Sequence, residues 1–344
     1  MDHQPLRHMS RKVGYWWGDK KASRFNTAEL GDHLAKHGFQ FVKLNLDKSF
    51  IQQGPFCAII HKFSDILTKA DSGDSNSLKI IESFKQFIQE SPHTIVIDSI
   101  PNVRILLNRF EQYRIIQDSQ LALQEGCLTP PFAALNTDDT EAIKLTLKEN
   151  NVKYPFVCKP LIAHGSSSAH QMCLVFSEKG LLDIKPPCVA QTFINHNAKL
   201  FKIFVINDKY FVVDRPSLKN FKAGEIPTLH FDSPDISKPN SSSHLTELDE
   251  VSRASPPVLK ENDVRRHVQI LRKILGLKLF GVDLIVENQT GRPYVIDMNI
   301  FPGYVGVDNH VSLIANMIAE LVKESEMKIF GDTNSHPLAH NKQS

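Results

Sequence analysis

Apolar and polar residues alternate with two different periods along the first hundred residues of the chain. Apolar runs of strand length occur at residues 13–16, 41–44, 58–61 and 94–98. Helical periodicity, with apolar residues three and four apart, occupies the intervening residues 26–37, 62–70 and 75–90. Such alternation predicts a small α/β unit with a mostly parallel sheet.

The middle of the chain predicts a second unit that is richer in strands. A helix is expected over 102–125, and Pro130 and Pro131 open the new unit, with a further helix near 138–150. Strand-like runs then follow at residues 156–159, 172–176, 188–193, 200–205 and 210–213. The Ser- and Pro-rich stretch 222–258 is expected to form a long mobile loop of the kind that covers binding sites.

The last third of the chain predicts an amphipathic helix, a hairpin and a second helix. The first helix covers 262–275, with Gly276 as its C-cap, and the second lies near 309–324. Between them, two β-branched runs at 279–286 and 294–299 flank a turn-rich segment, which is typical of a β-hairpin. From about Gly331 the chain is polar and is expected to be frayed.

The hairpin places acidic side chains opposite each other. If its turn is centred on Thr290, Asp283 faces Asp297, and Asn299 shares the face of Asp297. Two facing carboxylates in buried strands repel, and burial raises the cost of ionising them. A divalent cation removes both problems, and an all-oxygen set of this kind suits Mg²⁺. A hairpin with unrelated acids near its ends is the alternative.

Composition adds limits on location and chemistry. With 41% hydrophobic and 23% charged residues, the chain is an ordinary globular protein, and its longest apolar runs are too short to span a membrane. The polar N-terminus has no secretory signal. Five cysteines without C-x-x-C spacing predict reduced thiols in the core of a cytoplasmic protein, and they stand at Cys57, Cys127, Cys158, Cys173 and Cys188.

Charge is concentrated in the middle of the chain. The whole chain has a net charge of +2, whereas residues 153–222 carry ten Lys/Arg against four Asp/Glu. This excess predicts a site for a small polyanion. Nucleic acid is disfavoured because no signature of a nucleic-acid-binding domain is present. Walker A, G-x-G-x-x-G, zinc and G-x-S-x-G signatures are missing too, which disfavours the enzyme classes that carry them.

Several residues of this basic region could bind phosphate. Lys159 ends a strand and precedes a Gly/Ser loop at 164–170, which is either a phosphate loop or a plain hairpin turn. Lys202 alternates with apolar neighbours, and in isolation a solvated lysine is the favoured interpretation. Arg215 with Lys219 could clamp phosphate, and the strand end 191–194 could pair with an adenine ring or be ordinary core.

The acidic hairpin, the strand lysine before a Gly/Ser loop and the Gln-led segment together resemble the ATP-grasp superfamily. Within it, the chain resembles the inositol 1,3,4-trisphosphate 5/6-kinase family from about residue 11 to 325. The motifs that carry the resemblance are Val13–Trp16, Gln53–Pro55, Ile60–Lys62, Ala163–Gly165, Phe193–Asn197, Arg215–Phe221, Leu245–Leu248 and Asn299–Tyr304.

The resemblance implies a role for individual positions. ATP contacts fall on Arg109, Lys159, Gln191, Thr192, Phe193, Ile194, Lys202, Ser217, Ser233 and Ser237. Inositol phosphate contacts fall on Lys21, His164, Gly165, His170, Lys202, Arg215, Asn299 and Gly303. The loop 164–170 is one residue longer than in vertebrate members, so His164 is the alternative to His170. Two Mg²⁺ ions are implied, one on Asp283 and Asp297 and one on Asp297 and Asn299, and catalytic roles fall on Lys159, Lys202 and Asp297.

The implied fold is α/β with α+β parts: a Rossmann-like N-terminal domain followed by two ATP-grasp domains that clamp ATP. The expected boundaries are a flexible 1–10, an inositol phosphate domain 11–108, a central domain 109–214, a metal-binding domain 215–325 and a flexible tail 326–344. The chain is expected to act as a cytoplasmic monomer, without nucleic acid or membrane.

The implied activity is ATP- and Mg²⁺-dependent phosphorylation of inositol polyphosphates. Inositol 3,4,5,6-tetrakisphosphate would be phosphorylated at the 1-position, and inositol 1,3,4-trisphosphate at the 5- or 6-position. Such phosphoryl transfer needs mainly positioning and charge neutralisation, and no carboxylate base is identified. An ATP-grasp carboxylate–amine ligase and a non-catalytic inositol phosphate binder are the alternatives. The preferred isomer, any isomerase or phosphatase activity, the oligomeric state and the source organism stay open.

Overall fold

The computed structural model describes residues 10–163, 167–241 and 243–331. Its backbone forms two compact units. Unit 1 takes in the described residues up to Phe63, then Asp74–Ile97, and the chain from Asp308 onward. Unit 2 consists of Ser64–Gly73 and Asp98–Val307. Each unit is described by itself below.

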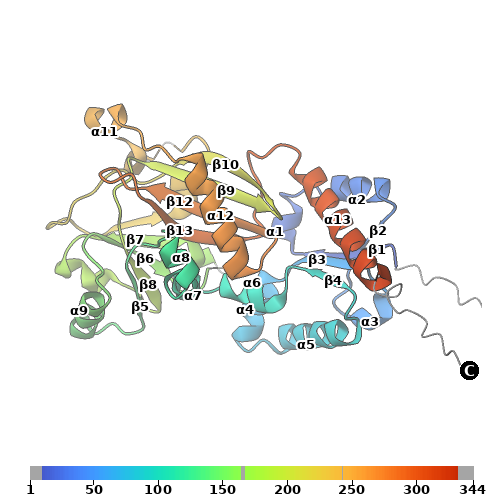
Figure 1. Ribbon diagram of the computed structural model, residues 1–344. Helices are drawn as coiled ribbons and strands as arrows, with labels where there is room; N and C mark the ends of the chain where they lie inside the picture. The colour runs from blue at the N-terminus through green and yellow to red at the C-terminus, as the bar shows by residue number, and fades with distance from the viewer. Residues whose placement is uncertain (1–9, 164–166, 242, 332–344) are drawn as a thin grey trace, which may run out of the picture. The chain divides into compact units, whose positions relative to one another are not determined.

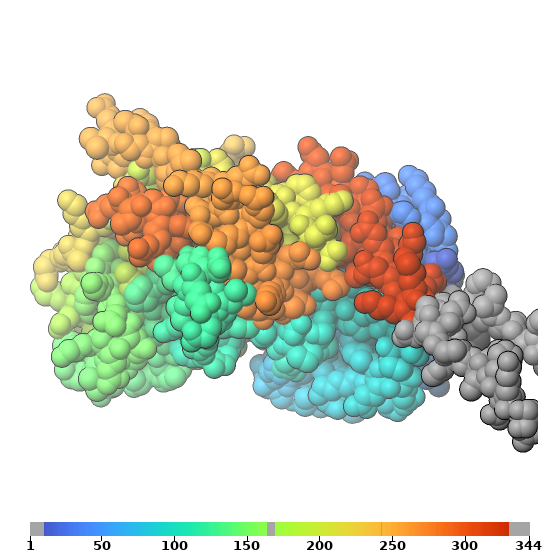
Figure 2. Space-filling view, in the orientation of Figure 1, coloured from blue at the N-terminus to red at the C-terminus, as the bar shows by residue number. Residues whose placement is uncertain are grey.

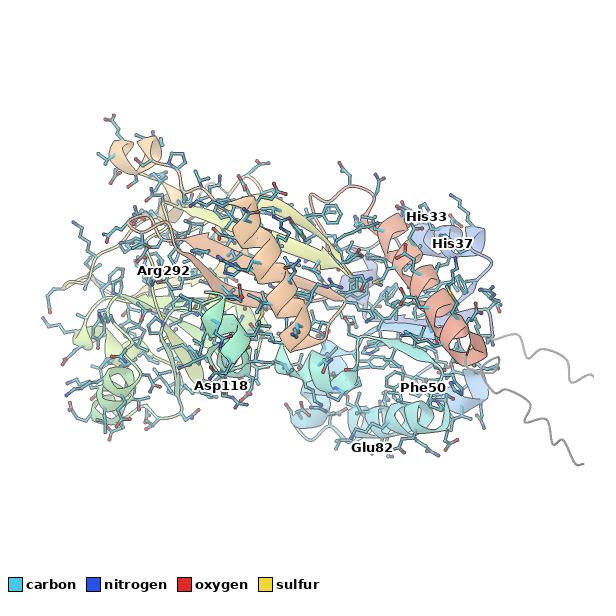
Figure 3. All side chains as sticks on the ribbon, in the orientation of Figure 1. His33, His37, Phe50, Glu82, Asp118 and Arg292 are labelled. Atoms are coloured by element: carbon cyan, nitrogen blue, oxygen red, sulfur yellow. The ribbon has the colours of Figure 1, made fainter. Side chains whose placement is uncertain are left out.

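Unit 1 is built on a four-stranded sheet in the order β2-β1-β3-β4, and all its neighbouring strands are parallel. The strands are β1 (Lys12–Trp17), β2 (Gln40–Lys43), β3 (Ala58–Lys62) and β4 (Ile95–Ile97). Its helices are α1 (Asp19–Ala22), α2 (Thr27–Lys36), α3 (Phe50–Gln53), α5 (Ser75–Glu90) and α13 (His310–Gly331). The parallel α/β unit predicted from the sequence is therefore confirmed. In Figure 1, α13 runs beside α2, and the two helices pack together. Figure 3 labels His33 and His37 on and just after α2.

Local sequence explains why these elements form. Asp74 caps α5 by accepting a hydrogen bond from Ser77 N at 2.8 Å. The buried face of α5, which includes Ile81, Phe84 and Phe87, follows the helical spacing seen in the sequence. On β1, a Cβ at Gly14 would lie 2.9 Å from the side chain of Leu44, so glycine is required where these layers pack closely.

Unit 2 contains two antiparallel sheets. The five-stranded sheet has the order β11-β7-β6-β8-β5. Its strands are β5 (Phe132–Leu135), β6 (Phe156–Pro160), β7 (Gln171–Val175), β8 (Cys188–Thr192) and β11 (Leu229–Asp232). One face of this sheet packs on α9 (Thr140–Glu149) and on the 3₁₀ turn η2 (Glu178–Asp183) through a core that includes Ile143, Leu147 and Leu181.

The four-stranded sheet of unit 2 has the order β10-β9-β12-β13. Its strands are β9 (Lys199–Ile206), β10 (Lys209–Pro216), β12 (Leu279–Val286) and β13 (Pro293–Ile300). The helix α12 (Glu261–Leu275) crosses this sheet in Figure 1 and buries a stripe that includes Val264, Val268 and Leu271. It ends at Gly276, whose φ of 62° is the left-handed C-cap expected from the sequence.

The predicted helix 102–125 is wrong as a single element. The structure breaks it into α6 (Ile100–Ile105), α7 (Arg109–Gln117) and α8 (Gln120–Gln124). The cause is local capping: Asn108 accepts hydrogen bonds from Phe110 N and Glu111 N, and Ser119 accepts one from Ala122 N. Each cap starts a new helix with its own direction. The helix α4 (Ser64–Asp71), which precedes α5 in the chain, also belongs to unit 2.

The prediction of one long loop over 222–258 is also wrong. This stretch contains β11, α10 (Ser233–Ser237), the 3₁₀ turn η3 (His244–Thr246) and α11 (Glu250–Ala254). Its Ser, Pro and Asp residues serve as caps of short elements; Asp249, for example, accepts from Ser252 N at 2.7 Å. The strand β5 was missed because its four residues are too few to show a period.

Two further expectations concern the core and membranes. All five cysteines are free and buried, as predicted, so they act as small core residues. Among the described residues, no helix has both the length and the apolar character that crossing a membrane requires. The predicted frayed tail beyond Gly331 lies outside the described residues.

Candidate active site

A transverse row of residues crosses the four-stranded sheet of unit 2. Val213 on β10 pairs with Lys202 on β9, Lys202 pairs with Asp283 on β12, and Asp283 pairs with Asp297 on β13. Paired residues of neighbouring strands share a face, so a cation and two carboxylates lie side by side. The pairing of Asp283 with Asp297 confirms the register predicted from the hairpin. A bulge follows at once, because the next pair is Leu284 with Val295.

Lys202 binds the first of the two carboxylates. Its Nζ lies 2.9 Å from Oδ1 and 3.1 Å from Oδ2 of Asp283. Only 21% of the Lys202 side chain is exposed, so the interpretation of this residue as a solvated lysine is wrong. Burial raises the pKa of Asp283, an effect that Lys202 opposes and the neighbouring Asp297 reinforces. The positive charge of Lys202 thus partly offsets the cost of burying the negative charge of Asp283.

One carboxylate oxygen of Asp297 makes no hydrogen bond to the part of the chain that the structure describes. Its Oδ1 is buried and has no hydrogen-bond partner among the described residues. The nearest cation is Arg109, whose Nε lies 3.9 Å away and is itself without a hydrogen bond. Burying a carboxylate oxygen without a hydrogen bond costs free energy unless another group binds that oxygen.

The donor set fits Mg²⁺. Asp283 and Asp297 supply carboxylate oxygens on one face, and strand alternation places the side chain of Asn299, two residues along β13, on the same face. Within the described parts of the chain, no group of three or more His, Cys, Asp and Glu side chains is arranged to hold a metal alone. Magnesium is often bound by one or two carboxylates together with phosphate oxygens and waters, so a two-carboxylate site of this kind suits a metal that arrives with phosphate.

Lys159 joins the five-stranded sheet to the acidic strand. Its Nζ donates to the backbone oxygen of Ile296 at 2.6 Å, to Gln191 Oε1 at 2.7 Å and to Tyr113 OH at 3.0 Å. Burial lowers the pKa of Lys159 to about 8, although Asp297 acts in the opposite direction. The buried ammonium of Lys159 therefore contacts the backbone of Ile296, the residue that precedes Asp297.

One face of α7 organises this cluster. Arg109, Gln112 and Tyr113 are buried and stand three and four residues apart, so they project from the same side of the helix. Tyr113 OH donates to Ile296 O at 2.8 Å, and Gln112 Oε1 accepts from Met298 N at 3.1 Å. These two bonds flank Asp297 on β13. The sequence analysis missed Gln112 and Tyr113, although their spacing from Arg109 was a visible signal.

Arg109 also holds the segment that follows β6. Its Nη1 donates to Pro160 O at 2.7 Å and its Nη2 donates to Ala169 O at 3.1 Å. The backbone N–H of Arg109 donates to Leu161 O at 2.9 Å. Arg109 is 2% exposed, so a single buried cation binds both Pro160 and Ala169 and faces Asp297.

The segment after β8 is fixed by a buried histidine. His196 contacts Ile194 O through Nδ1 at 2.6 Å and Ser217 Oγ through Nε2 at 2.7 Å. Burial lowers the pKa of His196 to about 4, so the ring is neutral near pH 7. Within the same segment, Phe193 packs against Phe221 with ring centroids 5.7 Å apart. The predicted nucleotide residues 193 and 194 therefore lie in a half-buried segment that Phe221 and the buried His196 hold in place.

The segment from Phe301 to Val307, called here the strap, folds back across the face of the sheet that carries Asp283. A Cβ at Gly281 would meet Pro302 at 3.4 Å, and a Cβ at Gly306 would meet Val213 at 3.2 Å. Tyr304 OH donates to Val205 O at 3.0 Å in the middle of the strap. Phe301 and Tyr304 have positive φ angles of 34° and 53°, which non-glycine residues adopt only under local constraint.

The other predicted residues fall in several places. Arg215 is partly exposed and donates from Nη2 to Val305 O of the strap at 2.6 Å. Thr192 Oγ1 accepts from Lys153 N at 3.1 Å, and Ser237 Oγ donates to Ser233 O at 3.0 Å within α10. Gly303 lies in the strap and His170 ends the 3₁₀ turn η1 (Ser167–His170). His164 and Gly165 lie outside the described residues.

Lys21 belongs to unit 1 and is unusual there. It is 7% exposed, and its Nζ lies 4.3 Å from the centre of the Phe25 ring. Burial, together with the nearby Lys62, lowers the pKa of Lys21 to about 6. Lys21 is therefore not an ordinary solvated lysine, whereas the adjacent Lys20 is exposed.

Taken together, unit 2 gathers three cations and two carboxylates around the neighbouring strands β12 and β13. Lys159 and Arg109 lie beside β13, and Lys202 lies beside β12. Cations aimed at one place, with carboxylates that suit a divalent metal, neutralise the charge of phosphate groups. In Figure 3 Asp118 marks the end of α7, and Arg292 marks the turn of the hairpin that carries the acids.

Comparison with known proteins identifies both parts of the chain. The family described as the inositol 1,3,4-trisphosphate 5/6-kinase ATP-grasp domain matches residues 123–320, and the pre-ATP-grasp domain of the same kinase matches residues 12–103. Inositol-tetrakisphosphate 1-kinase of Xenopus laevis is 40% identical over 319 residues, which cover 92% of this chain and 80% of the relative. Inositol-tetrakisphosphate 1-kinase 2 of Glycine max is 30% identical, with 91% and 95% covered.

Solved structures agree on the fold. The chain is similar to the D-cycloserine synthetase DcsG, with a TM-score of 0.55, 14% identity, and coverage of 90% of this chain and 99% of that one. It is also similar to the D-alanine–D-alanine ligase of Bacillus anthracis, with a TM-score of 0.52, 13% identity, and 92% and 98% covered. At such low identity these likenesses show the ATP-grasp fold alone. The sequence relatives show more: this chain belongs to the inositol 1,3,4-trisphosphate 5/6-kinase family, the ATP-grasp enzymes that phosphorylate inositol phosphates with ATP.

Proposed function

We propose that this kinase transfers the γ-phosphoryl group of ATP to the 1-hydroxyl of inositol 3,4,5,6-tetrakisphosphate and to the 5- or 6-hydroxyl of inositol 1,3,4-trisphosphate. Family membership supports ATP and an inositol phosphate as the substrates. The observation that carries the site assignment is the contact of Lys159 Nζ with Ile296 O at 2.6 Å. It fixes a phosphate-type lysine next to Asp297, where two carboxylates suit a metal.

The roles of the ATP-side residues follow from these contacts. Lys159 and Arg109 present buried positive charge toward Asp297, and we assign them to the ATP phosphates. The segment around Gln191–Ile194, held by His196, would bind the adenine and ribose, with Ser217 beside it. Ser233 and Ser237 on α10 complete the proposed nucleotide contacts.

Mg²⁺ fits the acidic hairpin. Asp283 and Asp297 would hold one ion, and Asp297 with Asn299 a second. When bound, the ions would neutralise the charge that develops on the transferred phosphoryl group. The chain itself supplies position: Tyr113 and Gln112 bond the backbone on both sides of Asp297, so its carboxylate is held in a set orientation.

Lys202 is assigned in this proposal to both substrates. It lies in the row between Val213 and Asp283, on the strand next to the hairpin. Arg215, two residues beyond Val213 on β10, shares that face and would hold an acceptor phosphate bidentately. Each acceptor phosphate carries roughly −1.5 to −2 charges near pH 7, so these cations favour binding. The proposed acceptor contacts also include Lys21, His164, Gly165, His170, Asn299 and Gly303.

The test is a product assay over a panel of inositol phosphates. Purified protein with ATP and Mg²⁺ should convert inositol 3,4,5,6-tetrakisphosphate to a pentakisphosphate and inositol 1,3,4-trisphosphate to tetrakisphosphates, as separated by ion-exchange chromatography. ADP should form in equal amount, and omission of Mg²⁺ should stop both. Absence of product from every member of the panel would refute the proposed function.

Two controls sharpen this assay. A carboxylate–amine ligase would release ADP and inorganic phosphate only when an acid and an amine are both supplied, so ADP release with an inositol phosphate alone separates the two reactions. A non-catalytic binder would retain the inositol phosphate without releasing ADP.

The finer expectations on organisation are part of the proposal. The inositol phosphate part would be residues 11–108, the central ATP-grasp part 109–214 and the metal-binding part 215–325. The kinase would act in the cytoplasm as a monomer, without nucleic acid or membrane. Light scattering coupled to size exclusion would give a single species near the chain mass of 38.9 kDa.

A further inference from the structure

Asn197 is a buried amide whose hydrogen-bonding capacity is completely used. Its Nδ2 donates to Ser255 O at 2.7 Å and to Ser252 O at 3.2 Å. Its Oδ1 accepts from Asn220 Nδ2 at 2.7 Å and from Asn288 Nδ2 at 2.9 Å. An asparagine side chain has two donors and can accept two bonds, so all four are made, and the residue is only 6% exposed.

These four bonds join segments that are distant in the chain. Asn220 belongs to the stretch after β10 that carries Ser217, and Asn288 belongs to the turn of the β12–β13 hairpin. Ser252 lies in α11 and Ser255 follows it. Asn197 itself lies between β8 and β9, in the segment proposed to hold the adenine. One side chain thus joins its own segment to three others of unit 2.

Asn195, two residues before Asn197, makes further hydrogen bonds to two of these segments. Asn195 and Phe221 exchange two bonds, from Phe221 N to Asn195 Oδ1 at 2.8 Å and from Asn195 Nδ2 to Phe221 O at 3.0 Å. Asn288 N donates to Asn195 O at 2.9 Å. Asn195 therefore binds two of the three segments that Asn197 binds, the stretch after β10 and the hairpin turn.

The α11 segment shows why Asn197 matters more than an ordinary core amide. No residue of α11 is buried, and Val251 is 80% exposed. In Figure 2 this segment protrudes from the rest of unit 2. Apolar packing therefore contributes little to its attachment, whereas Asn197 and Asn220 bond Ser252 and Ser255 directly. The polar contacts determine where α11 sits.

We propose that Asn197 is a positioning residue of the nucleotide site: it fixes the adenine segment, the Ser217 segment, the metal-binding hairpin and α11 relative to one another. This inference rests on the proposed function for the location of ATP. Because Asn197 acts through other residues, its loss should weaken ATP binding more than it slows the transfer step.

The test uses Asn197→Gly in the full chain. The φ of Asn197 is 49°, a left-handed angle that glycine adopts without strain, so this change removes the side chain and preserves the backbone. Calorimetric titration with ATP and Mg²⁺ should show a Kd about tenfold higher, and KM for ATP should rise by a similar factor while kcat changes less than about threefold. The matched control is Asn151→Gly, at another left-handed asparagine with a φ of 54° that is exposed after α9.

A second variant separates positioning from general loss of folding. Asn288→Ala removes the donor to Asn197 Oδ1 at an accessible turn and keeps the backbone bond to Asn195. It should raise the Kd for ATP about threefold, and the double variant should bind ATP no worse than Asn197→Gly, because both changes break the same contact.

Four results would decide against this inference or against the proposed function. Unchanged ATP affinity in a folded Asn197→Gly protein, or an equal loss in Asn151→Gly, would overturn the inference. Additive losses in the double variant would do the same. A wild-type protein that binds ATP but phosphorylates no inositol phosphate would refute the proposed function, while the response of ATP affinity to Asn197→Gly would still decide this inference.

Discussion

Lys202 and Asp283 face each other on neighbouring strands, with Nζ 2.9 Å and 3.1 Å from the two carboxylate oxygens. A metal bound by Asp283 would compete with the Lys202 ammonium, because the lysine already contacts both carboxylate oxygens. The ion pair thus opposes the rise in the pKa of Asp283 that burial causes.

Replacing Lys202 by methionine should separate these roles. Turnover should fall about 100-fold or more, because a cation proposed to neutralise phosphate charge is removed. Affinity for Mn²⁺ in the absence of nucleotide, measured by electron paramagnetic resonance, should rise because the competing ammonium is gone. Lys202→Arg is the control, and it should keep the Mn²⁺ affinity near that of the wild type. Weaker Mn²⁺ binding by Lys202→Met would contradict the competition.

Asp297→Asn should abolish turnover without harming the fold. The change removes one of two facing carboxylates, so repulsion with Asp283 falls and the melting temperature should stay level or rise. Turnover should drop at least about 1000-fold, as expected for loss of a metal ligand. Asp118→Asn, at the exposed end of α7 labelled in Figure 3, is the matched control. A fully active Asp297→Asn enzyme would remove the metal assignment.

Tyr113→Phe tests a residue that only the structure revealed. Its hydroxyl accepts from Lys159 Nζ and donates to Ile296 O, and both partners are left short of one bond in the variant. The free energy of unfolding should fall by about 1–3 kcal/mol and kcat/KM for ATP by roughly tenfold. Denaturant titration and steady-state kinetics measure the two effects. Tyr154→Phe, at a partly buried tyrosine elsewhere in unit 2, should show neither.

His196 predicts a loss of stability in mild acid. Burial lowers the pKa of His196 in the folded protein to about 4, from an ordinary value of about 6.5. The unfolded chain therefore binds a proton that the folded protein excludes as pH falls from 6.5 to about 4, and stability declines over this window by up to about 3 kcal/mol. His196→Gln has no such proton, so its urea midpoint should fall less between pH 7 and pH 5 than that of the wild type. Parallel curves for both proteins would count against the neutral buried ring.

The hairpin shows what sequence symmetry can reveal. Asp283 and Asp297 stand seven residues either side of Thr290, and the structure pairs them. Local periodicity likewise predicted the parallel sheet of unit 1 and the helix α12. These features depend on residues close in the chain, where alternation and capping act directly.

Features that depend on distant partners were less accessible. Lys202 looked solvated because its partner Asp283 is 81 residues further along the chain. Tyr113 and Gln112 were hidden in a segment predicted as one long helix, since the cap at Asn108 was overlooked. The bulge after Asp283 leaves no mark in the spacing of the acids themselves. Tertiary contacts decide such positions, and one sequence does not display them.

The strap makes unit 2 intolerant of changes in chain length at one specific place. It is held at Pro302, at Tyr304 and again at Gly306, with two of its residues at positive φ. An inserted residue would displace these contacts, because Pro302, Tyr304 and Gly306 each lie against a different strand of the sheet. The turn at Thr290 and Gly291, where nothing lies within 4 Å of a Cβ at Gly291, can be lengthened instead. A tag or sensor peptide for this protein therefore belongs at the hairpin turn, which lies on the same two strands as the acids.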